Sequence, residues 1–138
     1  MDPPRIVILL VEDEPSHAEL VAHAFQRSDD DARIRVAGTL AQARKALADE
    51  APDLLIADVI LPDGRGTELL EKSAAGRFPV IIMTSHGSEE LAVDALKSGA
   101  DDYVVKSPET LAQMPRAARP VLTQRDGRRQ HYQAQEQL

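Results

Sequence analysis

Five short apolar segments recur along the chain, and each runs into a segment of helical composition. The apolar segments are IVILLV, IRVA, LLIA, VIIM and YVV, at residues 6–11, 34–37, 54–57, 80–83 and 103–105. A strand followed by a helix, repeated with short connections, is typical of a doubly wound α/β sheet with parallel strands. We therefore predict a single α/β domain built around a five-stranded parallel sheet.

Residues beside the apolar segments mark the ends of the predicted helices. Thr39 and Ser88 stand where N-caps stand, before helical segments at 40–48 and 89–98. Gly99 follows the second of these segments as a C-terminal stop, and Pro108 suits the first position of the last helix.

The apolar segments also differ in pattern. The first, third and fourth are apolar throughout, as expected of strands that helices cover on both faces. In the second, Arg33 and Arg35 alternate with Ile34 and Val36, so the two faces of the strand differ. We expect this strand at an edge of the sheet.

Composition excludes several classes of site. Hydrophobic residues make up 43% of the chain and aromatic residues only 3%, which predicts an aliphatic core. The chain has no cysteine, so disulfides, thiolate metal sites and cysteine nucleophiles are excluded. The longest apolar run, residues 6–11, is too short to cross a membrane, and the first residues lack a signal-peptide pattern. We expect a cytoplasmic protein without a membrane partner.

Charge divides the chain into two parts. Residues 1–114 hold 11 Lys and Arg against 21 Asp and Glu, whereas residues 115–138 hold 5 Arg and 2 acids. An acidic body argues against a nucleic-acid partner. We predict a globular domain over 1–114, followed at 115–138 by a polar, basic C-terminal helix or connector.

Polar residues follow four of the apolar segments directly. Glu12 and Asp13 follow the first, Asp58 the third, Thr84 the fourth and Lys106 the fifth. Because the carboxyl ends of parallel strands meet at one edge of the sheet, where such folds bind ligands, we expect these side chains in one cleft.

The expected cleft has the parts needed for phosphoryl transfer. Three neighbouring carboxylates repel one another unless a hard divalent cation such as Mg²⁺ binds between them. A carboxylate can itself attack phosphorus and form an aspartyl phosphate. Thr84 can donate a hydrogen bond to a phosphoryl oxygen, and Lys106 can pair with another. Asp58 is therefore predicted to receive a phosphoryl group.

Four motifs together resemble the response-regulator receiver domain of two-component signalling. They are LLVEDE at 9–14, LLIADVILPDGRG at 54–66, IIMTS at 81–85 and GADDYVVK at 99–106, and the resemblance covers residues 5 to 112. It implies a flavodoxin-like fold with the strands in the order 2-1-3-4-5. It also implies that a histidine kinase or histidine phosphotransfer protein donates the phosphoryl group to Asp58.

The resemblance also assigns roles within the cleft. Asp13, Asp58 and the backbone carbonyl of Ile60 would bind Mg²⁺, and Glu12 would reach it through water. Thr84 and Lys106 would contact the phosphoryl group. Tyr103 would be the aromatic switch that turns inward with Thr84; as an isolated residue it is equally well read as a half-buried edge aromatic.

The resemblance further implies an output surface and partners. The surface would comprise the helix at 88–98, the strand at 103–105 and the helix at 107–113, and a homodimer could form through it. The segment at 103–120 resembles receivers that are joined to sensor or histidine-kinase modules, so a fused or separate sensor or output domain is expected. We expect no DNA-binding or catalytic output domain within these residues, and no catalysis beyond the domain's own phosphorylation and dephosphorylation.

Two other functions also use an acid at this position or the same fold. A Mg²⁺-dependent phosphohydrolase with an aspartyl nucleophile usually has a second acid two residues later, where this chain has Ile60. An interaction module that is never phosphorylated would not need the complete set of site residues.

Three smaller expectations follow from single residues. Ile60 and His86 should tune the lifetime of the phosphoryl group. His17, His23, His86 and His131 show no metal-ligand spacing and are read as surface residues. Family members commonly place proline directly after the site lysine, but here Ser107 intervenes, so we predict a trans Lys106–Ser107 peptide.

Overall fold

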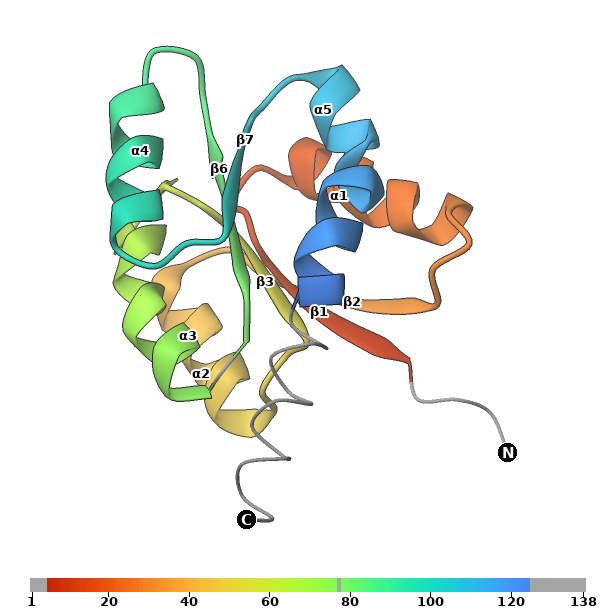
Figure 1. Ribbon diagram of the computed structural model, residues 1–138, viewed down its shortest axis with the longest axis horizontal. Coiled ribbons are helices and arrows are strands. Elements are labelled where there is room, and N and C mark those ends of the chain that lie inside the picture. The colour runs from red at the N-terminus through yellow and green to blue at the C-terminus, as the bar shows by residue number, and fades with distance from the viewer. Residues whose placement is uncertain (1–4, 77, 125–138) are drawn as a thin grey trace.

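The protein has a five-stranded parallel sheet that helices cover on both faces (Figure 1). The computed structural model describes residues 5–76 and 78–124. The strands are β1 (Ile6–Val11), β2 (Ala32–Ala37), β3 (Leu54–Asp58), β6 (Val80–Thr84) and β7 (Asp102–Val105). They lie in the order β2-β1-β3-β6-β7, and each neighbouring pair is parallel. The predicted fold and the strand order 2-1-3-4-5 are confirmed.

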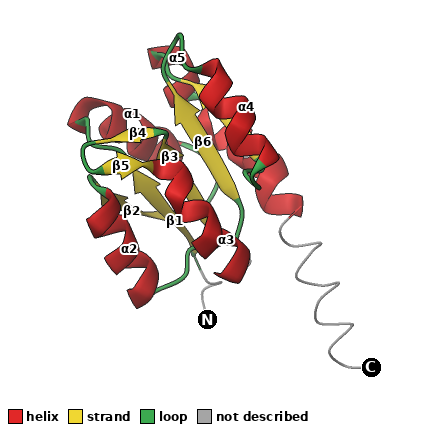
Figure 2. Ribbon diagram, turned by 90° about the vertical axis from the view of Figure 1, so that its left-hand side faces the viewer, coloured by secondary structure: helices red, strands yellow, loops and turns green. Residues whose placement is uncertain are grey.

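The helices form one layer on each side of this sheet. Figures 1 and 2 show α2 (Leu40–Asp49), α3 (Leu70–Gly76) and α4 (Glu89–Lys97) on one face. On the other face lie α1 (Pro15–Arg27) and α5 (Pro108–Ala112). The connection from β3 to α3 holds a short hairpin that was not predicted. Its strands are β4 (Ile60–Leu61) and β5 (Gly64–Arg65), and the 3-10 helix η1 (Gly66–Leu69) follows.

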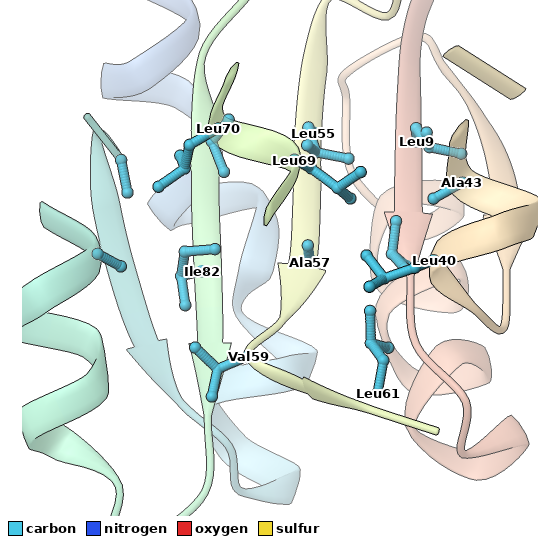
Figure 3. Close-up of a cluster of buried hydrophobic side chains, with 14 of the residues drawn as sticks. Leu9, Leu40, Ala43, Leu55, Ala57, Val59, Leu61, Leu69, Leu70 and Ile82 are labelled. Carbon is cyan, nitrogen blue, oxygen red and sulfur yellow. The ribbon is translucent and has the colours of Figure 1, made fainter. Parts of the chain in front are cut away.

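The core is aliphatic, as composition predicted, and lies on both faces of the three inner strands. Successive residues of a strand point to opposite faces, so Leu55 and Ala57 belong to one buried cluster and Leu54 and Ile56 to the other. Figure 3 shows part of the first cluster, in which Leu40 of α2 packs toward the sheet. Because β1, β3 and β6 are covered on both sides, their carboxyl ends are held rigidly where the polar residues begin.

Helix ends follow the predicted signals closely. The Thr39 hydroxyl accepts a hydrogen bond from the Gln42 amide at 3.1 Å, and Gly99 has a φ of 119° after α4. Ser88 precedes α4 as predicted, but its side chain makes no capping hydrogen bond.

Strand β2 lies at the sheet edge, as its alternation predicted. Ile34 packs against the core, but Val36 is 55% exposed. On the other face, the Arg35 guanidinium donates to the backbone oxygens of Ala46 and Glu50 at the end of α2. Arg35 is half-buried because its long side chain covers apolar surface while its charged end stays in contact with polar groups.

Helical structure continues after Gln113, over residues 114–124. Met114, Ala118, Val121 and Leu122 are buried in the cluster on the α1 face, so core packing extends past residue 114. The division into 1–114 and 115–138 stays a prediction, and residues 125–138 lie outside the described part of the chain.

Two further features concern the described residues alone. None of their peptide bonds is cis, so the predicted trans Lys106–Ser107 peptide is confirmed. No helix among them combines the length and apolar character that crossing a membrane requires.

Candidate functional site

Lys106 joins two acids from different strands at the carboxyl edge of the sheet. Its Nζ atom lies 2.6 Å from Oδ2 of Asp58 and 3.1 Å from Oε2 of Glu12. Both carboxylate residues are buried, with Asp58 at 6% and Glu12 at 2% exposure. The predicted convergence of these three residues is therefore present in the structure.

Backbone hydrogen bonds place these residues by extending the sheet past its apolar runs. The Glu12 amide donates to the Ala37 oxygen at 2.9 Å, and the Lys106 amide donates to the Thr84 oxygen at 2.7 Å. The residue after Asp58, Val59, donates to the Met83 oxygen at 2.9 Å. These hydrogen bonds continue the strand pairing beside Glu12, Asp58 and Lys106. They therefore fix the backbone at each of these residues, and with it the direction of the side chain.

The acidic residues form a cluster suited to a hard cation. Glu12, Asp13 and Asp58 each offer a carboxylate oxygen, and these oxygens lie within 4.8 Å of one another. Asp13 is exposed whereas the other two are buried, so the cluster opens to solvent on one side. Oxygen donors with room for retained water are the ligands that Mg²⁺ prefers. The residues present fit that ion.

Burial and charge shift the protonation of this cluster. Burial raises the pKa of Glu12, and the charge of Asp58 raises it further. Hydrogen bonds from the Glu14 amide and from Lys106 offset only part of that rise. Burial works against the charge of Lys106, but its hydrogen bonds and attraction to Asp58 and Glu12 outweigh burial and raise its pKa. The ammonium is therefore charged and compensates the two buried acids.

Thr84 is fully buried beside this cluster, and its hydroxyl contacts backbone. It donates to the Ser88 oxygen at 3.1 Å, with a longer contact of 3.4 Å to the Ser85 oxygen. Tyr103 is half-buried and packs against the same core cluster as Leu91 of α4. Thr84 ends β6 as predicted, whereas Tyr103 is the second residue of the adjacent strand β7, where it pairs with Ile82.

The loop after Asp58 is held by its own contacts. Asp63 accepts hydrogen bonds from the Leu40 and Ala41 amides at 2.8 and 3.0 Å, which caps α2. The Ile60 amide lies 3.3 Å from Oδ1 of Asp58, and the Ile60 side chain is 53% exposed. His86, on the loop before α4, is also exposed.

His17 is the site residue that the sequence interpretation missed. Its lack of metal-ligand spacing predicts a surface histidine, yet its Nδ1 atom lies 3.4 Å from Lys106 Nζ and 3.8 Å from Oε1 of Glu12. The available signal was its spacing, because a residue four positions after Asp13 falls in the first turn of the helix that starts at this edge. His23 and His86 are exposed as predicted, and His131 lies outside the described residues.

Comparisons with known proteins agree with this geometry. The sequence model of the response regulator receiver domain matches residues 8–117. The chain is 37% identical over 126 residues to the methanogenesis regulatory protein FilR1 of Methanothrix harundinacea, covering 88% of this chain and 28% of FilR1. It is 35% identical over 103 residues to the transcriptional regulatory protein DpiA of Escherichia coli strain K12, covering 73% of this chain and 46% of DpiA.

A solved structure shows the same fold. The receiver domain of NtrX from Brucella abortus superposes with a TM-score of 0.69 at 30% identity, covering 80% of this chain and 96% of that domain. The chain spans less than half the length of the two curated relatives, FilR1 and DpiA. With the family match over residues 8–117, these findings show that the chain belongs to the response regulator receiver domain family.

Proposed function

We propose that this domain takes a phosphoryl group from a phosphohistidine of a histidine kinase or histidine phosphotransfer protein onto Asp58. The observation that carries the proposal is the environment of the Asp58 carboxylate. It is buried, it pairs with Lys106 at 2.6 Å, and its oxygens cluster with those of Glu12 and Asp13. A buried acid at a strand end, held by one cation and flanked by two further acids, is suited to act as a nucleophile.

The chemistry assigned to Asp58 is a single displacement. One carboxylate oxygen forms a bond to phosphorus while the bond from phosphorus to the donor nitrogen breaks, and the electron pair leaves with the donor imidazole. Glu12, Asp13, Asp58 and the backbone carbonyl of Ile60 would hold Mg²⁺, whose charge would offset that of the phosphoryl group. Lys106 would exchange its contact with the carboxylate for one with a phosphoryl oxygen.

The response to phosphorylation would begin at Thr84. To contact the phosphoryl group, its hydroxyl must leave the Ser88 oxygen, which lies at the start of α4. Tyr103 would turn inward in the same step. The surface that changes would comprise α4, β7 and α5, and a homodimer, a sensor domain or an output domain would bind there.

Intact mass after incubation with acetyl phosphate and Mg²⁺ tests the proposal. We expect a stable gain of one phosphate in the wild-type protein and none in Asp58→Asn, which keeps the shape of the side chain and removes the nucleophile. Asp94→Asn, an equivalent change at an exposed position on α4, is the control and should be labelled normally. Full labelling of Asp58→Asn would rule out the assignment.

The same experiment separates the alternatives. Steady release of phosphate over many turnovers would indicate a phosphohydrolase. Absence of any modification would indicate an interaction module that is not phosphorylated. The exposed apolar side chain of Ile60, two residues after Asp58, cannot supply the second acid that the phosphohydrolase needs.

A further inference from the structure

The imidazole of His17 covers one side of the Lys106 ammonium. Its Nδ1 atom lies 3.4 Å from Lys106 Nζ, and the two residues are 89 positions apart in the chain. His17 belongs to the first turn of α1, and its side chain is 38% exposed. One part of the ring is therefore covered by the site while the rest faces solvent.

Three acceptors surround the three N–H groups of the Lys106 ammonium. They are Oδ2 of Asp58 at 2.6 Å, Oε2 of Glu12 at 3.1 Å and Nδ1 of His17 at 3.4 Å. The 3.8 Å separation between Nδ1 and Oε1 of Glu12 is too long for a hydrogen bond. Because a lysine ammonium can only donate hydrogen bonds, Nδ1 is the acceptor in its contact with Lys106, and the ring hydrogen is on Nε2.

Phosphorylation of Asp58 would change two of these three acceptors. The new bond to phosphorus would convert the Asp58 carboxylate into the uncharged acyl group of a mixed anhydride, and the phosphoryl oxygens would become the stronger acceptors. Glu12 would be drawn toward the cation that it shares with Asp13. The lone pair of His17 is the acceptor whose role would stay the same before and after transfer.

We propose that His17 is a positioning residue, which holds the Lys106 ammonium on the α1 side of Asp58 while Lys106 exchanges the carboxylate for the phosphoryl group. The inference rests on the proposed function of Asp58. Without the imidazole lone pair, the ammonium has only the two carboxylates and pairs more tightly with the nucleophile. Phosphorylation of Asp58 then becomes slower, although the acids that bind the cation are unchanged.

Two substitutions at His17 separate the lone pair from the bulk of the ring. His17→Leu removes the acceptor, and His17→Asn places an amide oxygen close to the position of Nδ1. His23→Leu makes the same change at an exposed position later on α1 and serves as the control. The rate constant for labelling by acetyl phosphate is measured at saturating Mg²⁺, together with the Mg²⁺ affinity and the melting temperature.

The expected labelling is about tenfold slower in His17→Leu, the scale of one hydrogen bond to a charged group. His17→Asn should recover most of this loss, and His23→Leu should match the wild type. Because tighter pairing of Lys106 with Asp58 competes with the cation, Mg²⁺ affinity should fall in His17→Leu alone, and saturating Mg²⁺ keeps this effect out of the labelling rate. Labelling of His17→Leu at the wild-type rate, or an equal loss in His17→Leu and His17→Asn, would overturn the inference.

A second measurement uses the unphosphorylated protein, so it does not depend on the function of Asp58. Nitrogen-edited NMR spectra report how fast a lysine ammonium exchanges hydrogen with water, and the Lys106 signal is assigned by its loss in Lys106→Arg. Exchange should be slow in the wild type, His17→Asn and His23→Leu, and several-fold faster in His17→Leu. Fast exchange in the wild type, or no change in His17→Leu, would contradict the inference. A wild-type protein that acetyl phosphate does not label would instead contradict the proposed function.

Discussion

Gly66 and Asp58 meet through their backbones: a Cβ atom on Gly66 would lie 2.1 Å from the backbone oxygen of Asp58. The Gly66 amide also donates to the Val59 oxygen at 2.9 Å, which holds the end of the β4–β5 hairpin against the end of β3. The position of the Asp58 backbone thus depends on a close approach that only glycine permits.

Gly66→Ala should therefore move the Asp58 backbone or destabilise the fold. Because the obstructing atom is backbone, we expect the free energy of unfolding to fall by about 1–3 kcal/mol. Chemical denaturation measures this change. Gly38→Ala is the matched control, since the nearest atom to its Cβ would be the Gln42 side-chain oxygen at an ordinary 3.6 Å. Equal effects of the two substitutions would refute the argument.

Asp63 should stabilise the fold in a manner that depends on pH. The hydrogen bond from the Leu40 amide, helped by that from Ala41, lowers the pKa of Asp63 below its ordinary value of 3.8. A carboxyl group whose pKa is lower in the folded state stabilises the fold fully at pH values above 3.8, its ordinary pKa. This stabilisation is lost as the pH falls through the lower pKa of the folded state. Asp63→Ala should be less stable than the wild type at neutral pH, and the difference should shrink below pH 3.8.

Thermal unfolding at a series of pH values checks this prediction. Asp94→Ala, at an exposed position on α4, removes one carboxylate that caps no helix and serves as the control. A stability difference between Asp63→Ala and the wild type that stays constant into the acid range would mean that the charge of Asp63 does not contribute.

The Thr84 hydroxyl should hold the loop before α4 in place. Thr84→Val keeps the shape and removes the hydrogen bond to the Ser88 oxygen, a loss of about 1 kcal/mol. We expect faster hydrogen exchange at the Leu91 and Ala92 amides, which donate to the same oxygen. Thr123→Val removes a hydroxyl that donates to the Arg119 oxygen at an exposed position and should alter neither amide. Unchanged exchange in Thr84→Val would contradict this role.

Sequence reasoning succeeded where the signal was local. Asp58 and Lys106 each end an apolar run, and strand pairing alone brings such positions to one edge of the sheet. Thr39 and Gly99 were likewise readable because a cap acts within one turn of its own helix.

Prediction from the sequence failed where a contact depends on segments that are far apart in the chain. The partner of the His17 ring is 89 positions away, and its contact depends on how α1 packs against α5, which begins two residues after Lys106. The importance of Gly66 depends on a hairpin of two-residue strands, too short to show an alternating pattern. Val36 has the pattern of a buried strand residue, but nothing in the sequence shows that the edge leaves it 55% exposed.

Phosphate loss from Asp58 should be slow, and Ile60 should be the cause. Hydrolysis needs a water molecule in line with the phosphoryl group, and a polar side chain at the mouth of the site can orient it. Ile60 stands there with 53% of its surface exposed and its amide 3.3 Å from Oδ1 of Asp58, and it cannot hydrogen-bond water through its side chain. Ile60→Asn should therefore shorten the lifetime of the phosphorylated protein.

His86 is the competing residue, because its imidazole, on the exposed loop two positions after Thr84, could hold a water or shield the phosphate when protonated. We expect His86→Ala to change the rate of phosphate loss less than Ile60→Asn, since Ile60 is only two residues after Asp58 and its amide contacts the Asp58 carboxylate. The decay of phosphorylated Asp58, followed by intact mass in the wild type and both variants, measures the three rates. An unchanged rate in Ile60→Asn together with a large change in His86→Ala would show that the loop before α4, and not the loop after β3, controls the water.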